Sequence, residues 1–174
     1  MQDGKSNKMH LAILRHGDAN WPLPGQSDFN RELSVAGEAE AHRVGLYLNK
    51  INFKPDIVIC SSAARCIKTL SALKTRQPFE AKIDVSDELY HSDIEKYLTA
   101  LTRHKNASNV LLIGHNPTLE DLLIHLLGSE VTQSAVPFGL QTAGLVIIEL
   151  DLSHDGMARD VILVDSFAPY DQTI

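Results

Sequence analysis

Short apolar runs alternate with segments of helical periodicity along most of this chain. The apolar runs predict strands at 9–14, 56–60, 81–85 and 109–113. The amphipathic segments between them predict helices at 34–50, 63–75, 92–104 and 116–127. Two further runs, 144–150 and 161–164, flank the turn-like residues 153–156 and predict a hairpin. This order favours an α/β fold: a three-layer sandwich with a mostly parallel central sheet, helices on both faces and a C-terminal antiparallel hairpin at the edge.

Capping residues set the expected helix limits. Ser34 is the expected N-cap of the first long helix, and Ser92-Asp-Ile-Glu95 has the pattern of a capping box. Asn116-Pro117 offers an N-cap and an N1 proline for the helix that ends before Gly128. A polar stripe is expected on a solvated helix surface and includes Glu38, Glu40 and Lys50.

Length and charge restrict the class of protein. A chain of 174 residues is expected to form one domain, here 8–174, preceded by a flexible tail over 1–7. The chain is 44% hydrophobic and 22% charged, which is typical of a globular domain. Its net charge of −6 argues against nucleic acid or an anionic membrane as a general partner. Any anion must therefore be bound by a few placed cations.

Targeting and metal signals are not evident. The first eight residues are polar and unlike a signal peptide, and no run approaches the 18 or so apolar residues of a membrane span. We therefore expect a cytoplasmic protein. Cys60 and Cys66 are expected to be reduced thiols rather than a disulfide framework. No metal-ligand spacing is present, so neither a metal nor a cofactor is expected.

Arginine and histidine follow three of the expected strands. Arg15 and His16 follow the first, Arg65 the second, and His115 the strand at 109–113. Ligands of such sheets bind at the carboxyl ends of the strands, so these side chains are expected to converge. Arginine matches the oxygens of a phosphoryl group, and neighbouring cations favour a neutral histidine that can attack phosphorus. The set predicts metal-free phosphoryl transfer.

Three motifs in this order resemble a known family, the histidine phosphatase superfamily with its phosphoglycerate mutase-like fold. They are Leu14-Arg-His-Gly17, Ser61-Ser-Ala-Ala-Arg-Cys-Ile-Lys-Thr69 and Gly114-His-Asn-Pro117. Within the superfamily, the chain resembles the small SixA-type phosphohistidine phosphatases. Arg31-Glu-Leu-Ser-Val-Ala-Gly37 resembles a further family segment, in which Glu32 replaces the usual proline. In the second motif Ala63 stands at the usual proline position.

The resemblance implies a role for each matched residue. His16 is the implied nucleophile that becomes phosphorylated, Arg15 and Arg65 bind the phosphoryl oxygens, and His115 completes the pocket. Gly17 and Asn116 are weaker candidates for the same pocket. Gly17 is also expected to let the chain turn sharply, and Asn116 to cap its helix.

The general acid is less defined. Asp87-Glu88-Leu89 resembles the segment where larger members of the family keep this acid, so Glu88 is the candidate proton donor. Asp18 is the alternative donor, although a loop-capping role also suits it.

The expected partner is a phosphohistidine-bearing protein. Only 22 residues separate Arg65 from Glu88, which leaves no room for a lid, so the pocket is expected to be open. Protonated imidazole is already a good leaving group, so a site with a doubtful acid suits a P–N bond better than a P–O bond. Through the resemblance, phosphorelay and sugar-transport phosphocarrier proteins are both candidate substrates.

Three alternatives remain at this point. A small phosphatase of the same superfamily would act on a sugar phosphate or another phosphomonoester. A cysteine-dependent phosphatase would need Cys-x5-Arg, whereas Cys60 and Arg65 are separated by four residues. A non-catalytic phosphate-binding module on this fold is the third.

Overall fold

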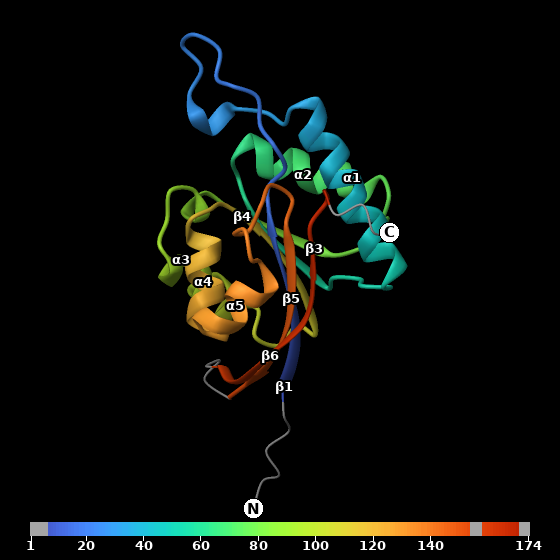
Figure 1. Cartoon of the computed structure of the whole chain (residues 1–174), viewed down its shortest axis with the longest axis vertical. Coiled ribbons are helices and arrows are strands. Elements are labelled where there is room, and N and C mark those ends of the chain that lie inside the picture. The colour runs from blue at the N-terminus through green and yellow to red at the C-terminus, as the bar shows by residue number, and fades with distance from the viewer. Residues whose placement is uncertain (1–6, 154–157, 171–174) are drawn as a thin grey trace, which may run out of the picture.

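Six strands form one sheet in the computed structural model, which describes residues 7–153 and 158–170 (Figure 1). Their order across the sheet is β3-β2-β4-β1-β5-β6. The strands are β1 (Asn7–Arg15), β2 (Ile57–Ser61), β3 (Lys82–Ser86), β4 (Asn109–Gly114), β5 (Leu145–Leu152) and β6 (Ala158–Phe167). Residues 1–6 of the expected N-terminal tail and 154–156 of the expected hairpin turn lie outside the described residues.

The sheet is mixed, as predicted. β4 pairs in parallel with both β1 and β2, and β2 pairs in parallel with β3. On the other side, β1 pairs antiparallel with β5, and β5 pairs antiparallel with β6. The expected C-terminal hairpin is therefore confirmed at one edge. Because β1 is an internal strand, both of its sides are hydrogen-bonded, which fixes the position where the chain leaves it.

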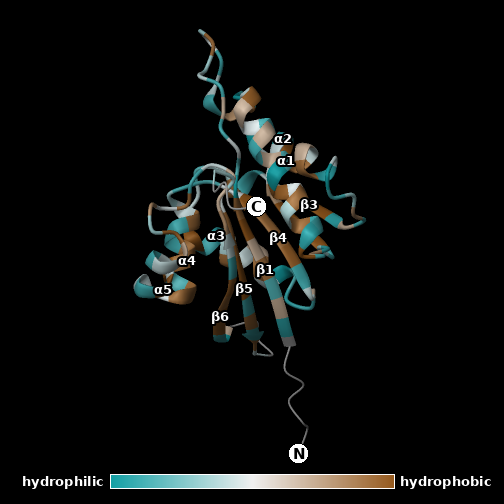
Figure 2. Ribbon diagram, turned by 45° about the vertical axis from the view of Figure 1, so that its right-hand side comes forward, coloured by the Kyte–Doolittle hydropathy of each residue, from teal (hydrophilic) through white to brown (hydrophobic). Residues whose placement is uncertain are grey.

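Helices cover both faces of the sheet and confirm the three-layer arrangement (Figures 1 and 2). Leu11 and Ile13 of β1 belong to the core beneath α3 and α4, whereas Ala12 and Leu14 belong to the core beneath α1 and α2. Alternate side chains of a strand point to opposite faces, so a strand buried on both faces is apolar throughout. The helices are α1 (Val35–Lys50), α2 (Ala64–Lys74), α3 (Ile94–Arg103), α4 (Thr118–Leu127) and α5 (Ser129–Ala135).

Helix starts agree with the prediction at Ser34 but not at two other positions. The Ser34 side chain accepts a hydrogen bond from the Gly37 N–H and caps α1. For α3, the cap is Asp93, whose carboxylate accepts from the Lys96 N–H, so the prediction of Ser92 is wrong by one residue. Asn116 does not cap α4: the N-cap is Pro117, which was expected at the first helical position, and Oδ1 of Asn116 is buried without a hydrogen-bond partner among the described residues.

Three short elements were not expected. Besides α5, two 3-10 turns occur, η1 (Asp28–Asn30) and η2 (Asp87–Leu89). The turn η1 belongs to the connection between β1 and α1, which projects beyond the carboxyl end of β1 (Figure 1). Short elements of this kind leave too few periodic positions to be recognised in a sequence.

Candidate active site

The carboxyl ends of β1, β2 and β4 bring the two expected histidines and Arg65 together. Register places Arg15, the last residue of β1, beside Gly114, the last residue of β4, so His16 and His115 leave the sheet side by side. Their ring centroids are 5.2 Å apart. Arg65, in the first turn of α2, contacts both rings. Arg65 and the two histidines therefore form one cluster, and the positive charge of Arg15 is near enough to lower the pKa of His16.

The His16 ring has a defined tautomer. Its Nδ1 lies 2.7 Å from the main-chain oxygen of Gly17, and since a carbonyl can only accept, Nδ1 carries the proton. Its Nε2 accepts a hydrogen bond from Nε of Arg65 at 3.1 Å. The lone pair of neutral His16 is therefore on Nε2, on the side of the arginine.

His115 is oriented by hydrogen bonds at both nitrogens. Its Nδ1 faces Nη2 of Arg65 at 3.3 Å, and because a guanidinium can only donate, this nitrogen accepts. Its Nε2 lies 2.8 Å from Oγ of Ser61, at the end of β2, and donates to it. The main-chain N–H of His115 donates to the hydroxyl of Tyr97. The ring is thus held in place from three elements.

Both histidines are held in the neutral form. Burial lowers the pKa of His16 from 6.5 to about 4, and the positive charges of Arg65 and Arg15 act in the same direction. Burial also lowers the pKa of His115 to about 3, with further contributions from His16 and Arg65. A buried imidazole next to a guanidinium loses more from protonation than it does in water. Near neutral pH, Nε2 of His16 is therefore unprotonated.

Arg15 offers a free donor in a buried place. Its Nη1 donates to the main-chain oxygen of Leu140 at 2.9 Å. Its Nε is buried and has no hydrogen-bond partner in the described part of the chain. An unpartnered buried donor is costly, and an anion in the cluster would satisfy it.

Asp28 is a functional candidate that the sequence interpretation missed. Its main-chain oxygen accepts from Nη1 of Arg65 at 2.8 Å, and its carboxylate accepts from Nη2 at 3.1 Å. The carboxylate also accepts from Arg31 at 2.8 Å and from the Tyr90 hydroxyl at 2.9 Å. The bond from Arg31 is the main reason that the pKa of Asp28 falls to about 2. The only available sequence signal was a carboxylate three residues before Arg31.

Tyr90 was missed for a different reason. It follows η2, lies with its ring 5.7 Å from that of His115, and faces the guanidinium of Arg65 at 5.6 Å. Nothing in its local sequence distinguishes it from a core tyrosine. Tyr90 joins the cluster because η2 follows β3, which ends at the same edge of the sheet as β2.

Gly17 is required by a close approach of two backbone segments. A Cβ at this position would lie 2.6 Å from the main-chain oxygen of Gly37, in the first turn of α1. Its N–H donates to Oγ1 of Thr69 at 3.0 Å. The backbone does not adopt a left-handed φ here, so the expected sharp turn is replaced by tight packing against α1.

Asp18 and Glu40 are part of the support for this loop. The Asp18 carboxylate accepts from Oγ of Ser34 at 2.6 Å, in agreement with a loop-capping role. Glu40 was expected on a solvated surface, but it is 0% exposed. That expectation is wrong because Glu40 faces the loop after β1, where its carboxylate accepts from the Asp18 N–H at 3.0 Å.

Two of the weaker site candidates have other contacts. The Glu88 carboxylate forms exposed ion pairs with Arg103 at 3.1 Å and Lys96 at 3.9 Å, so the structure does not join it to the histidine cluster. The Asn116 amide donates to Glu120 at 2.5 Å and to the same Leu140 oxygen that binds Arg15. Asn116 thus lies beside the cluster and braces the loop that orients Arg15.

The cysteines do not have the environment of a nucleophile. Cys60 and Cys66 are both buried free thiols. Burial raises the pKa of Cys66 to about 12 and also raises that of Cys60. A thiolate nucleophile needs the opposite shift, which argues against the cysteine-dependent alternative.

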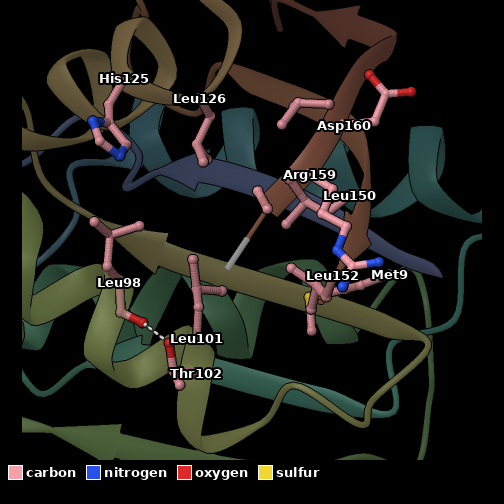
Figure 3. A pocket seen from close by; sticks show the side chains of 12 residues that line it. Met9, Leu98, Leu101, Thr102, His125, Leu126, Leu150, Leu152, Arg159 and Asp160 are labelled. Carbon is pink, nitrogen blue, oxygen red and sulfur yellow. Dashed lines mark hydrogen bonds between the residues drawn. The ribbon is translucent and has the colours of Figure 1, made fainter. Parts of the chain in front are cut away.

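A separate cavity lies at the other end of the strands. It has a volume of about 460 Å³ and is lined by residues that include Met9, Leu101, His125 and Leu150 (Figure 3). Met9 is near the start of β1, whereas the cluster follows its end, so this cavity is distinct from the candidate site. Among the described residues, no group of three or more histidine, cysteine or acidic side chains is placed to hold a metal ion. In the same residues, no helix is long and apolar enough to cross a membrane.

Comparison with known proteins identifies the family. The profile of the histidine phosphatase superfamily (branch 1) matches residues 11–97, half of the chain. The chain belongs to the histidine phosphatase superfamily. This confirms the resemblance seen in the motifs, and together with the SixA-type structures described next it supports a phosphatase.

Solved structures of other histidine phosphatases resemble this one over most of its length. A proposed phosphohistidine phosphatase SixA from Agrobacterium tumefaciens is 32% identical, with a TM-score of 0.82 over 92% of this chain and 99% of that one. A second proposed SixA, from Nakamurella multipartitia, is 25% identical, with a TM-score of 0.78 over 97% and 99% of the two chains. An uncharacterized chloroplastic protein of Arabidopsis thaliana is 26% identical over 70% of this chain, which spans 60% of the length of that protein.

Proposed function

We propose that this histidine phosphatase removes the phosphoryl group from phosphohistidine on a partner protein through a phosphohistidine of its own, at His16. The observation that carries the proposal is the unprotonated Nε2 of His16, 3.1 Å from Nε of Arg65 and within one cluster with His115. A neutral imidazole beside guanidinium donors is the arrangement that in-line attack on a phosphoryl group requires.

The first step is attack by His16. The phosphoryl oxygens bind Arg15 and Arg65, and the lone pair of Nε2 forms the new P–N bond while the bond to the leaving imidazole breaks. The leaving ring departs neutral if it is protonated on its other nitrogen. Negative charge in the pocket raises the pKa of His115. Its Nδ1 then takes up a proton from solvent and donates to a phosphoryl oxygen instead of accepting from Arg65.

The second step is hydrolysis. Water attacks the phosphorus of phospho-His16 from the side that the first imidazole has vacated, and the Nε2–P bond breaks. This regenerates neutral His16 and releases inorganic phosphate. Transfer from one imidazole to another needs no strong general acid, which suits a cluster that Glu88 does not join.

Exposed aromatic side chains support a protein as the substrate. Trp21 is 89% exposed and lies on the same connection as Asp28. Phe138 is 87% exposed and lies two residues before Leu140. Both loops hold an arginine of the candidate site, and in this proposal the two rings contact the protein that carries the phosphoryl group. Exposed aromatic residues are frequent centres of protein–protein contact.

The test is transfer of label from a phosphohistidine protein. The enzyme is mixed with a ³²P-labelled phosphohistidine domain, quenched at high pH within milliseconds, and digested for mapping. We expect label on His16 and none in His16→Asn, with Glu38→Gln, on the exposed face of α1, labelled as the wild type is. Label on another residue would refute the mechanism.

Substrate class is tested by comparison with small esters. The same cluster can bind any phosphoryl group, so kcat/KM for the phosphohistidine protein is compared with kcat/KM for sugar phosphates and other phosphomonoesters. A clear preference for the esters would replace the proposed substrate with a small molecule. Failure of every phosphorylated compound to turn over would indicate a non-catalytic binding module.

A further inference from the structure

A single peptide unit links a buried carboxylate to the His16 ring. The N–H of Asp18 donates to Oε2 of Glu40 at 3.0 Å. The carbonyl of Gly17 accepts from Nδ1 of His16 at 2.7 Å. These two groups belong to the same planar amide, so the hydrogen bonds run in series from the carboxylate, through the amide, to the imidazole.

Glu40 is buried, and its carboxylate accepts hydrogen bonds from groups that carry no charge. Glu40 is fully buried, and its second oxygen accepts from the hydroxyl of Tyr170. The Thr142 side chain is a further hydrogen-bond partner, and burial raises the pKa of the carboxyl group. These partners are neutral N–H and O–H groups. Burial of a carboxylate is unfavourable, and the hydrogen bonds that compensate for it connect Glu40 to the loop after β1.

We propose that Glu40 is a positioning residue that acts on His16 through the Gly17–Asp18 peptide unit. Hydrogen bonds in series polarise one another, so the carboxylate makes the Gly17 carbonyl a stronger acceptor for the proton on Nδ1. This keeps that proton on Nδ1 and leaves the lone pair on Nε2. The inference rests on the proposed role of His16 as the nucleophile.

The same link acts during phosphoryl transfer. As Nε2 forms its bond to phosphorus, positive charge appears on the imidazole ring, and the N–H at Nδ1 becomes more acidic. A carbonyl backed by a carboxylate stabilises this charge, as a buried carboxylate does when it binds a catalytic histidine directly. In this role no proton leaves Nδ1, and Glu40 acts as the acceptor of hydrogen bonds from the Asp18 N–H and the Tyr170 hydroxyl. The expected effect is therefore on the rate of transfer rather than on substrate binding.

Glu40→Gln is the informative variant, because glutamine keeps the shape and an acceptor oxygen for the Asp18 N–H but removes the charge. The substrate is phosphoramidate, a small P–N compound, so that protein docking is not involved. We expect phospho-His16 to form about 10-fold more slowly, which is the effect typical of replacing a hydrogen-bond partner behind a metal-binding histidine. KM is expected to stay within about twofold of the wild-type value. Glu38→Gln, which removes a charge from the exposed face of the same helix, is the matched control.

Nuclear magnetic resonance adds a readout that a purely structural role would not change. In ¹⁵N-histidine-labelled protein, we expect the Nδ1 proton of His16 to resonate downfield in the wild type and in Glu38→Gln, and to move upfield in Glu40→Gln. Thermal unfolding of each variant shows whether it is folded. If Glu40→Gln does not fold, exchange of the Asp18 amide in the wild type decides: strong protection is expected, and exchange as fast as in an exposed loop would overturn the inference.

The proposed function and the role of Glu40 are refuted by different results. If the wild type forms no phospho-His16 from either phosphoramidate or a phosphohistidine protein, the proposed function fails. If the wild type is phosphorylated on His16, and Glu40→Gln matches it in rate and in the Nδ1 proton resonance, the role of Glu40 fails while the proposed function stands.

Discussion

Asp28 holds Arg65 by two different groups, its main-chain oxygen at 2.8 Å from Nη1 and its carboxylate at 3.1 Å from Nη2. Arg65 in turn directs its Nε toward His16. The loop that carries Asp28 is therefore a structural part of the candidate site, although it lies outside the sheet and its helices.

Replacement of the Asp28 carboxylate tests this dependence. Asp28→Asn keeps the main-chain contact but weakens the hold on Nη2, so that the guanidinium of Arg65 is less well aligned with His16. We expect kcat/KM toward a phosphohistidine protein to fall by up to about 100-fold, the cost of a misplaced group in a reacting complex. Glu32→Gln, which removes an exposed ion pair with Lys68, should leave it unchanged. Equal activity in the two variants would show that Arg65 does not need Asp28.

The depressed pKa of His16 predicts activity in weakly acidic solution. Neutral His16 is the reactive form, and its pKa of about 4 means that it stays neutral where an ordinary histidine, with a pKa near 6.5, is protonated. Nucleophilicity is therefore lost only as the pH falls through about 4. Titration of the ¹⁵N-labelled imidazole measures the pKa directly, with the urea-unfolded protein as the reference. A midpoint near 6.5 in the folded protein would contradict the neutral cluster.

Cysteine chemistry predicts resistance to alkylation. With a pKa of about 12, about one Cys66 thiol in 10⁴ is ionised at pH 8, and only the thiolate reacts. Native protein treated with iodoacetamide should keep its activity and incorporate reagent far more slowly than protein in urea, as measured by mass spectrometry. Activity that is lost in proportion to alkylation of Cys60 or Cys66 would revive the cysteine-dependent alternative.

The exposed aromatic side chains predict a difference between protein and small substrates. Trp21→Ser and Phe138→Ser should each raise KM for a phosphohistidine protein by about 10-fold, because loss of an aromatic contact at an interface commonly costs more than 1 kcal/mol. Neither change should alter turnover of phosphoramidate. Ile162→Thr, at an exposed position of β6, is the control. A KM that stays the same for the protein, or rises equally for both substrates, would refute a docking role.

The sequence was sufficient for the architecture because the elements obey local rules. Apolar runs such as 110–113 are short and bounded by polar residues, which is typical of strands buried on both faces, and Ser34 marks a helix start by its own chemistry. The convergence of His16, Arg65 and His115 also followed, since parallel strands end at one edge of a sheet. These inferences need only the order of the elements along the chain.

The supporting contacts could not be predicted in the same way. Asp28 reaches Arg65 across 37 positions of the chain, and its place depends on the path of an irregular loop. Glu40 lies on a helix in a run that also contains the exposed Glu38, so its burial depends on how α1 rotates against the loop after β1. Such contacts depend on three-dimensional paths rather than on periodicity, which is why the reacting groups were easier to find than the groups that hold them.

The position of β1 inside the sheet fixes where His16 leaves the strand, whereas the exposed residues of the neighbouring connections are not fixed in this way. The strand that ends at Arg15 is hydrogen-bonded to β4 on one side and to β5 on the other, whereas Trp21 and Phe138 are carried by connections outside the ladder. Exchanges at Trp21 and Phe138 leave the end of β1 where its two neighbouring strands hold it, whereas changes at Asp28 or Leu140 of the same connections would disturb the contacts of Arg65 and Arg15. Selectivity for a partner can therefore change at exposed loop positions while the residues that hold the two arginines stay in place.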